Sequence, residues 1–421
     1  MELLYENVIV ISLVLATLGA AAAVRYPIAS VFAVVIALLL PLMVPISEYL
    51  IYVAFIVVIG FTNIASLFIP KNTQIRGADI SLVALIALAT VYVLYTKDLA
   101  LILTAFILAS VPTYVLIMIS DVRANVDVAI KYITFMVFAT ILFIIGAVML
   151  VYSSYIKNDV LYTLSFVILI TGLCLEVGCA PLHEWVPDIF TAGDPIPISI
   201  IASIAKIVPF VAALKIILLT SSTAILPKLL FYTAVISVIS MFVGNIGALT
   251  AKELSRVLAY STVANMGYIL AAFSAISYPE ILPLAFAGIF MQLLVNAFGK
   301  IGFFASIKGA GAATVSTYIL ALSFIGLPPL LGFWSKLFIL LAVANAGYLW
   351  VALALVANSA ISIPYYLRLA RELGKPWVLN SVNAVVLFTV LMMLITILPP
   401  YWILDPIRSL VLKGIFRGVF T

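Results

Sequence analysis

The segment VIVISLVLATLGAAAAV, residues 8–24, is apolar for close to the length of a membrane-spanning helix. Similar runs follow one another along the chain of 421 residues, of which 66% are hydrophobic and only 9% are charged. Soluble domains are near 45–50% apolar and about 25% charged. The sequence therefore predicts an all-α membrane protein that crosses the bilayer many times. A membrane β-barrel is excluded because it needs short strands of alternating polarity.

At about 20 apolar residues for each span, the chain can hold roughly 14 transmembrane helices joined by short connections. The mean hydropathy of +1.33 agrees with that density. We place the spans at residues 5–24, 28–47, 50–69, 79–96, 98–119, 128–153, 160–180, 196–219, 227–249, 256–276, 281–307, 316–344, 347–371 and 382–400.

The net charge of +5 is too small and too dispersed for a nucleic-acid-binding face.

The distribution of basic residues predicts the orientation of these spans. Numbered from the N-terminus, the even connections carry only Lys97, Lys157 and Lys228, and the positive-inside rule then puts both termini outside. The odd connections carry Arg25, Lys71, Arg76, Arg123, Lys252, Arg256, Lys308, Arg368, Arg371 and Lys375.

We expect a multi-pass protein of a prokaryotic plasma membrane, with both ends of the chain at the membrane. MELLYENVIV has no basic region of the kind that precedes a cleaved signal, so we expect the first span to be retained. The tail, residues 401–421, mixes apolar residues with Arg408, Lys413 and Arg417, and we expect an amphipathic helix at the membrane interface or a disordered end.

Metal and cofactor sites are not predicted. Cys174 and Cys179 lie five residues apart in an apolar segment, where we expect them to be small core residues. His183 is the only histidine, and no second ligand has suitable spacing. Since no part of the sequence resembles a soluble domain, any redox centre must belong to another protein, and no catalytic residue is predicted here.

Two spans contain proline-rich interruptions, CAPLHEWVPDIF at residues 179–190 and GLPPLLGFWSK at residues 326–336. Proline removes an amide donor and clashes with the preceding turn, so we expect both helices to break, the first at Pro181 and Pro187 and the second at Pro328 and Pro329. Broken helices at corresponding places in two halves are typical of inverted repeats with ion pathways at the breaks. Ordinary proline kinks are the simpler alternative.

Several ionisable residues lie inside apolar sequence, where an isolated charge costs about 2.5–3.5 kcal/mol. Lys206, Lys300 and Lys336 each lie about ten residues inside a span, and a row of such lysines joined by water molecules is a candidate proton relay. Lys131 follows Asp127 by one helical turn, so a local ion pair explains it as well as transport does. Lys215, near the end of its span, can extend toward the interface.

Two acidic or titratable groups flank the first interruption. Glu176 lies mid-span, five residues before Pro181, and a carboxylate without a partner there suits proton uptake. His183 follows the proline and lies beside Glu184 and Asp188, where it can gate or relay protons or simply satisfy the broken backbone.

A set of motifs resembles the antiporter-like membrane subunits of complex I, membrane-bound hydrogenases and Mrp-type cation/proton antiporters. The resemblance covers about residues 98–345. Its motifs, in order, are ASVPTYVLIMI (109–119), DVAIKYITF (127–135), APLHEWVPDIF (180–190), DPIPIS (194–199), IASIAKI (201–207), SRVLAYSTVANMGYIL (255–270), VNAFGKIGFF (295–304) and LSFIGLPPLLGFWSKLF (322–338).

The resemblance implies 14 helices with two inverted five-helix repeats, spans 4–8 and 9–13, each with one broken helix. The chain then divides into residues 1–78 with helices 1–3, residues 79–219 and 227–371 with the repeats, and residues 372–421 with helix 14 and the tail. The resemblance also implies that Lys206 is the bridging lysine of the eighth helix, that Lys300 is the relay residue of the eleventh helix and that Lys336 is the terminal residue of the broken twelfth helix. Asp127 stands where a glutamate commonly precedes the IKY motif.

Two positions depart from the family pattern. The fifth helix usually has a glutamate five residues before the proline that corresponds to Pro112, and this chain has Ile107 there. Its usual partner, a lysine of the seventh helix, is replaced by Glu176. Either Glu176 works alone or with another group, or this half of the chain has lost pumping.

The leading hypothesis is a proton-translocating subunit of a redox-driven assembly, either a quinone oxidoreductase or a membrane-bound hydrogenase. Its expected partners are antiporter-like paralogues and other membrane-arm subunits, the lipid bilayer, and a peripheral arm with Fe–S subunits. The alternatives are an Mrp-type cation/proton antiporter subunit, a non-pumping structural subunit, which Ile107 and Glu176 favour, and a stand-alone transporter of small solutes.

Overall fold

The computed structural model describes residues 2–23, 25–43, 49–69, 77–118, 126–220, 225–398 and 400–409. The tail beyond residue 409, with Lys413 and Arg417, and the basic positions Lys71, Arg76 and Arg123 lie outside the described residues.

The described chain is almost entirely helical, and every predicted span overlaps one of its helices. The helices are α1 (Glu2–Ala22), α2 (Pro27–Met43), α3 (Leu50–Leu67), α4 (Ala78–Tyr95), α5 (Leu99–Leu116), α6 (Val126–Tyr155), α7 (Asp159–Val177), α8 (Trp185–Ala192), α9 (Pro195–Ala202), the 3-10 turn η1 (Ile204–Lys206), α10 (Ile207–Leu219), α11 (Leu226–Thr250), α12 (Leu254–Phe273), α13 (Leu282–Lys308), α14 (Thr314–Ile325), α15 (Leu331–Asn345), α16 (Leu349–Leu373), α17 (Ser381–Leu394) and α18 (Tyr401–Ser409).

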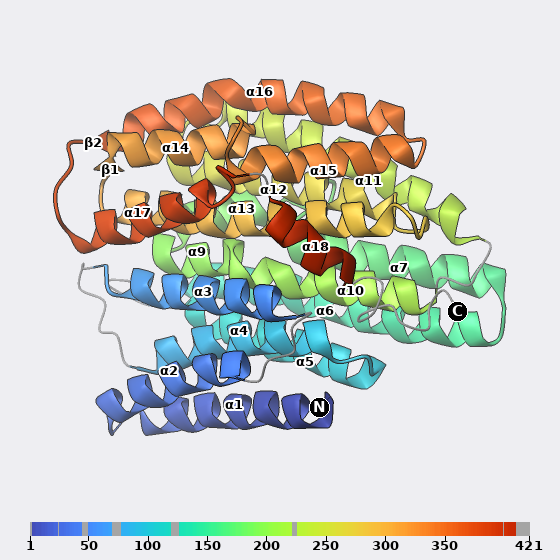
Figure 1. The fold of residues 1–421 in the computed structure, drawn as a ribbon, viewed down its shortest axis with the longest axis horizontal. Helices are drawn as coiled ribbons and strands as arrows, with labels where there is room; N and C mark the ends of the chain where they lie inside the picture. Colours follow the sequence, from blue (N-terminus) through green and yellow to red (C-terminus); the bar gives the residue numbers. More distant parts are fainter. Residues whose placement is uncertain are drawn as a thin grey trace.

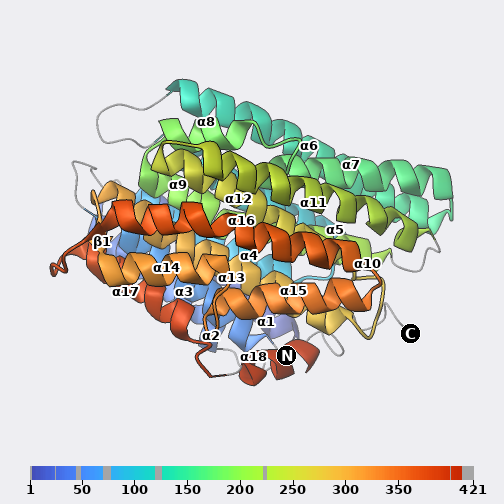
Figure 2. The ribbon, with the colours of Figure 1, turned by 90° about the horizontal axis from the view of Figure 1, so that it is seen from above.

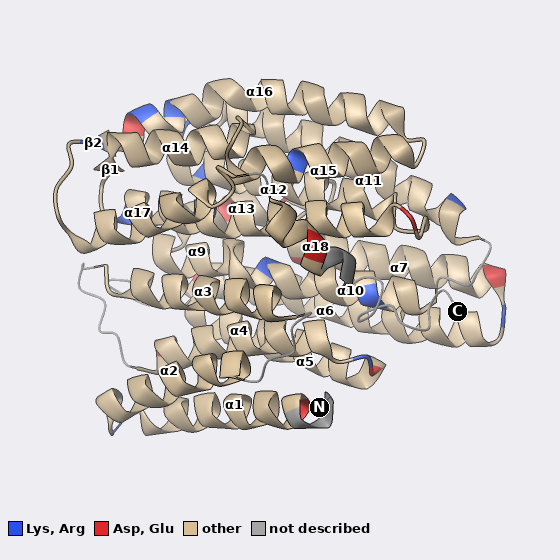
Figure 3. Cartoon of the chain, viewed as in Figure 1, with Lys and Arg blue, Asp and Glu red and all other residues tan. Residues whose placement is uncertain are grey.

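Among the described residues, ten helical segments are long and apolar enough to cross a membrane, and four shorter apolar helices accompany them. The long helices run side by side along one direction (Figures 1 and 2). Figure 3 shows charged residues mostly at the two ends of this bundle, with blue segments also part-way along it at α10 and α15. The chain is therefore a multi-pass membrane protein.

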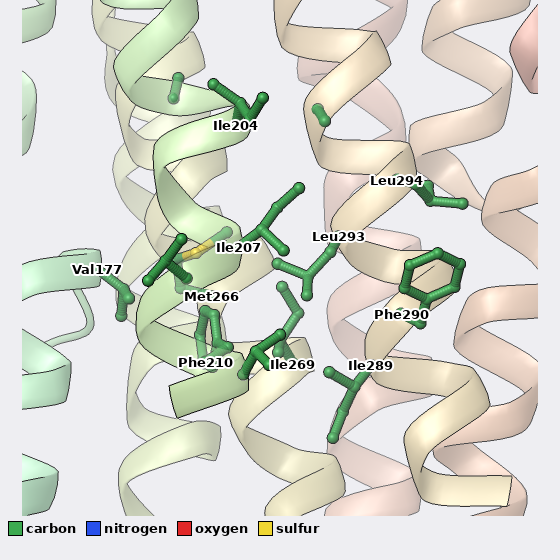
Figure 4. Packing of buried hydrophobic residues seen from close by; sticks show 14 of the residues in the cluster. Val177, Ile204, Ile207, Phe210, Met266, Ile269, Ile289, Phe290, Leu293 and Leu294 are labelled. Carbon is green, nitrogen blue, oxygen red and sulfur yellow. The ribbon is translucent and has the colours of Figure 1, made fainter. Parts of the chain in front are cut away.

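Two segments form the centre of the bundle. Residues Pro195–Leu219 and α13 have the largest buried shares of the ten candidate spans, 94% and 89%. Figure 4 shows Ile207 at the start of α10 and Leu293 of α13 pointing toward one another, with Met266 and Ile269 of α12 in the same layer. These central segments carry Lys206 and Lys300, so both lysines are placed where water is excluded.

Both proline-rich interruptions break their helices, as predicted. The helix α7 ends before Gly178, which has a left-handed φ of 81°, and α14 ends before Gly326, with a φ of 94°. Glycine at this position closes a helix without steric cost. The breaks contain Pro181, and Pro328 with Pro329. Pro187 corrects the prediction, because it lies in the first turn of α8, where a missing amide proton costs no helical hydrogen bond.

A third interruption was not predicted. The expected continuous helix at 196–219 ends at Ala202, passes through Ser203, whose φ and ψ are −105° and −95°, and resumes as α10 after η1. Pro209 accounts for the irregularity, because it cannot donate the amide hydrogen bond that Ala205 would accept four residues earlier. The interruption places Lys206 at the last residue of η1.

The described part of the tail is α18, which lies obliquely across the bundle beside α13 (Figure 1). The ring of Trp402 stacks on Phe55 of α3, with centroids 6.3 Å apart. At one end of the bundle, the two-residue strands β1 (Ala312–Ala313) and β2 (Gly374–Lys375) pair in parallel. They join the loop after α13 to the loop after α16.

Candidate functional site

The first break brings a buried carboxylate to the end of α7. Glu176 is only 6% exposed, and its Oε1 accepts a hydrogen bond of 3.2 Å from Ser110 Oγ on α5. Its Oε2 is buried without a hydrogen-bond partner among the described residues. A buried carboxylate oxygen without a partner is costly, so this group is a candidate for taking up a proton.

The position that the resemblance assigns to a glutamate does not face Glu176. The side chain of Ile107 is 41% exposed on the outer surface of α5, whereas Ser110, about one turn later, contacts the carboxylate. Thr113, three residues further along α5, is also buried, and its Oγ1 accepts a 3.0 Å hydrogen bond from Tyr132 of α6. Hydroxyl groups thus line the approach to Glu176.

Lys206 reaches the same break from the other side. Its Nζ donates a 2.8 Å hydrogen bond to the backbone carbonyl of Glu176 and lies 4.7 Å from the ring centroid of Trp185. The indole of Trp185 in turn donates to the carbonyl of Leu175. The last carbonyls of a helix have no partner within it and carry partial negative charge, so a buried ammonium fits there.

The irregular turn before Lys206 contacts the second half of the bundle. Asn296 of α13 donates through Nδ2 to the carbonyl of Ala202 at 2.7 Å, and Asn296 Oδ1 is buried with no hydrogen-bond partner in the part of the chain that the structure describes. Ser203 Oγ donates to Asn63 Oδ1 on α3 at 3.1 Å. Polar groups therefore run from the end of α9 to one turn before the next lysine of the row.

Lys300 is fully buried in α13 and points at α12. Its Nζ donates to the carbonyl of Leu258 at 2.6 Å and to Ser261 Oγ at 2.7 Å. It also lies 5.5 Å from the ring centroid of Phe324 at the end of α14. The ammonium is thus held by one hydroxyl, one carbonyl and one aromatic ring.

A network of polar side chains starts at the hydroxyl that contacts Lys300. Ser261 Oγ lies 2.8 Å from the hydroxyl of Tyr366 on α16, and Asn265 Nδ2 donates to the same hydroxyl at 3.2 Å. Gln292 Nε2 donates to Asn265 Oδ1, and Gln292 Oε1 accepts from Ser335 Oγ, both at 2.6 Å. All five side chains are buried, so the network is a dry connection toward α15.

Lys336 holds the second break as Lys206 holds the first. Its Nζ donates to the carbonyls of Phe324 and Ile325, the last two residues of α14, at 2.8 and 3.1 Å. It also lies 4.7 Å from the ring centroid of Tyr268. Asn245 Nδ2 lies 3.3 Å from the hydroxyl of Tyr268, which links this lysine to α11.

The remaining predicted residues lie at the outer mouth of the first break. Lys131 pairs with Asp188 of α8 at 2.5 Å, so the ion-pair partner of Lys131 is distant in sequence. Asp127, one turn before Lys131, is exposed. Arg256 of α12 lies 3.9 Å from the other oxygen of Asp188. Burial lowers the pKa of His183, whose Nδ1 is 3.3 Å from the carbonyl of Pro181.

Two further buried lysines were not assigned a role. Lys308 at the end of α13 pairs with Asp194 before α9 at 2.6 Å, with side-chain exposures of 4% and 7%. Lys215 is also buried, and its Nζ donates to the carbonyls of Val93, Leu94 and Thr96 at the end of α4. It therefore does not extend toward the interface.

The network residues have a signal that the sequence analysis did not use. Ser261, Asn265 and Tyr268 are spaced at i, i+4 and i+7, which puts them on one face of a helix. A polar stripe in an apolar helix indicates a buried network. Among the described residues, no group of three or more His, Cys, Asp or Glu side chains is placed to hold a metal ion.

Comparison with known proteins relates this geometry to a family. The family model described as NADH:quinone oxidoreductase/Mrp antiporter, transmembrane, matches residues 96–362. NADH-quinone oxidoreductase subunit N of Rubrobacter xylanophilus is 30% identical over 346 residues, which cover 74% of this chain and 71% of that protein.

Two solved structures share the fold. A chain of the membrane-bound sulfane sulfur reductase, an archaeal respiratory membrane complex, matches 99% of this chain and 99% of its own length with a TM-score of 0.83 at 18% identity. A chain of respiratory complex I from Thermus thermophilus with bound aureothin matches 95% of this chain and 98% of its own length with a TM-score of 0.75 at 23% identity.

Proposed function

The chain belongs to the NADH:quinone oxidoreductase/Mrp antiporter family, and from this premise we propose that it is a proton-translocating, antiporter-like membrane subunit of a redox-driven complex I-type assembly. The chemistry of electron transfer belongs to other subunits. This chain binds, holds and passes protons through side chains inside the membrane.

The row of buried lysines is the observation that carries the proposal. Lys206, Lys300 and Lys336 are at most 6% exposed, and each donates hydrogen bonds inside the bundle. Buried lysines are expensive in a membrane and are retained where they do work. Their placement at two helix breaks and on the central helix α13 supports a path for protons through the middle of the chain.

Each residue of the row has a proposed role. Glu176 takes up a proton beside the first break, Lys206 bridges the two halves, and Lys300 and Lys336 form the relay on the exit side. Two observations support this order: Glu176 Oε2 has no hydrogen-bond partner among the residues that the structure describes, and Lys206 contacts the carbonyl of the same residue. The charge pair of the first half is then formed by Glu176 with Lys206.

The outer groups form the mouth of the path. Lys131 and Asp188 make an exposed ion pair at the start of α8, and His183 lies half-buried between that pair and the break. We assign proton entry or exit to this mouth, with His183 as a gate or relay and Asp127 on its rim.

The proposed architecture follows the family. Ten candidate spans, together with α2, α12, the broken α14–α15 and α17, make fourteen crossings. Residues 79–219 and 227–371 are then two inverted five-helix repeats, each with a broken helix. Residues 1–78 form the first three helices, and residues 372–421 form helix 14 and the tail.

We place the chain in the plasma membrane of a prokaryote with both termini outside, because basic residues concentrate in the odd connections. Its proposed neighbours are other membrane-arm subunits, including antiporter-like paralogues, and a peripheral arm with Fe–S subunits. Mass spectrometry of the native complex, purified in mild detergent, tests these partners. Recovery of only small membrane subunits and antiporter paralogues would favour an Mrp-type antiporter subunit instead.

Neutralising the end of the row tests the function. Lys336→Ala should abolish proton pumping per electron in inverted membrane vesicles while the assembled complex remains at normal abundance. Lys215→Ala is the matched control, because this lysine is also buried and also binds carbonyls at a helix end but lies outside the row. Normal pumping by Lys336→Ala contradicts the proposal, and normal pumping by Glu176→Gln removes the first half from the path.

A further inference from the structure

Phe324 contacts both lysines, Lys300 through its ring and Lys336 through its backbone carbonyl. Lys300 Nζ lies 5.5 Å from the ring centroid of Phe324, and Lys336 Nζ binds the carbonyl of the same residue at 2.8 Å. The ring is 1% exposed and stacks on Tyr366 at 5.0 Å with an angle of 12°. Gly299 packs so closely that an added Cβ would lie 2.1 Å from this ring. An apolar ring has no site that can accept a proton, so a proton must pass around it.

The amide side chains of the network do not provide this detour. Asn265 and Gln292 hold oriented hydrogen bonds between Tyr366 and Ser335, with each amide nitrogen donating and each amide oxygen accepting. A neutral amide offers its acceptor on oxygen and its donors on nitrogen, so one atom cannot take up a proton and release another. These groups therefore orient the hydroxyls but do not pass a proton to α15.

Two hydroxyls remain, and they begin at Lys300. Ser261 Oγ accepts from Lys300 Nζ at 2.7 Å and lies 2.8 Å from Tyr366 Oη, whose ring covers Phe324. All three side chains are almost completely buried. Because Ser261 accepts a hydrogen bond from Lys300, it can donate its own hydroxyl proton to Tyr366. Tyr366 can then donate its hydroxyl proton past the ring of Phe324.

We propose that Ser261 and Tyr366 are proton-relay residues that carry the proton of Lys300 around Phe324 toward Lys336. The inference rests on the proposed function of the lysine row. An N–H bond of Lys300 breaks as an O–H bond forms on Ser261, whose original proton moves to Tyr366. The original proton of Tyr366 passes through water to the neutral amine of Lys336. One proton moves in total, and Lys300 ends neutral while Lys336 ends charged.

The test uses inverted membrane vesicles that contain the whole assembly, with NADH and dihydrogen tried first as electron donors. Proton uptake is measured with a pH-sensitive dye and divided by the electrons transferred. Tyr366→Phe removes the hydroxyl and keeps the stacked ring, and Ser261→Ala removes the other hydroxyl. Tyr162→Phe is the matched control, since its buried hydroxyl on α7 donates to the carbonyl of Thr220 at 3.3 Å and does not contact the lysine row.

The relay predicts that Tyr366→Phe and Ser261→Ala lower the protons moved per electron to the value of Lys300→Ala, while Tyr162→Phe keeps the original value. The double variant Lys300→Ala/Tyr366→Phe should lose no more than Lys300→Ala alone, because both changes interrupt one path. The relay also predicts that proton uptake is slower in D2O than in H2O. This difference should disappear in the same variants.

Three results would overturn the relay, and they separate it from the function on which it rests. Normal pumping by Tyr366→Phe, with pumping lost in Lys300→Ala, rejects the relay and keeps the proposed function. An equal loss in Tyr162→Phe and Tyr366→Phe shows that loss of any buried tyrosine hydroxyl lowers pumping, and it rejects a specific role for Tyr366. Normal pumping by Lys300→Ala and Lys336→Ala rejects the proposed function and the relay together.

Discussion

The buried ion pair between Asp194 and Lys308 should contribute strongly to the stability of the bundle. It joins the residue before α9 to the last turn of α13, two elements that lie 114 positions apart in the chain. The two charged atoms are 2.6 Å apart, and the side chains are only 7% and 4% exposed. Removing either partner deprives the other charge of this ion pair in a place that water does not reach.

The expected magnitude follows from that burial. Loss of one partner of a buried pair costs about 3–5 kcal/mol of unfolding free energy. Asp194 also accepts the amide hydrogen of Ile196 at 3.0 Å as the N-cap of α9, which adds about 1 kcal/mol. Asp194→Ala should therefore be the most destabilising change, Asp194→Asn should retain the cap and lose only the charge, and Lys308→Met should resemble Asp194→Asn.

A double-mutant cycle measures the coupling. The unfolding free energy of the purified chain is titrated in mixed dodecylmaltoside and SDS micelles, for Asp194→Asn, Lys308→Met and both together. The exposed pair Lys131–Asp188, with side chains 44% and 47% exposed, is the matched control and should couple by about 0.2–1 kcal/mol. If the buried pair couples no more strongly than this control, the argument from burial is wrong.

Three other results are expected. Gly146→Ala would place a Cβ 2.4 Å from a backbone nitrogen of α7 and should lower the unfolding free energy by about 1–3 kcal/mol in the same titration. Gly19→Ala, whose added Cβ would have its nearest atom at 3.4 Å, should lower it by less than about 0.5 kcal/mol. Equal costs would contradict the close contact of α6 with α7. Ile107→Ala should leave pumping unchanged and Ser110→Ala should reduce it, because only Ser110 contacts the buried carboxylate; the reverse result would return the family's glutamate position to the path. Burial lowers the pKa of His183 in the folded protein. The contribution of neutral His183 to the unfolding free energy is therefore complete above the pKa of the unfolded chain, near 6.5, and declines as the pH falls toward the lowered pKa of the folded protein. Thermal unfolding of His183→Gln between pH 5 and 7.5 should lack that decline, and an unchanged pH dependence would rule out His183 as its source.

Local chemistry made the helices and the two breaks predictable. Apolar runs fix where a membrane helix can lie, and proline with glycine fixes where it must end, as at Pro181 and Gly326. The third interruption was missed although Pro209 indicated it. A single proline inside a helix is often tolerated as a kink, and the contacts with Asn296 and Asn63 that stabilise the open turn come from other helices.

Partners of charged residues were the least predictable feature. The local spacing suggested that Lys131 pairs with Asp127, but the chain folds α8 against α6 and supplies Asp188 instead. The alignment of Ile107 with a family glutamate could not reveal which side of α5 faces inward, because α5 is apolar on nearly all sides. Such choices depend on helix packing, which sequence periodicity does not specify when a helix has no polar face.

The carbonyls that hold the lysines suggest why proton transfer can be coupled to movement. Lys206 and Lys336 bind the last carbonyls of α7 and α14, the two half-helices that end at breaks. Lys215 binds the end of α4, which is followed directly by α5 without such a break. When a lysine at a break gives up its proton, the half-helix loses part of the charge that holds its negative end. Under the proposed function, the contact at each break therefore links protonation to the position of a half-helix, whereas the contact of Lys215 joins α10 to the end of α4.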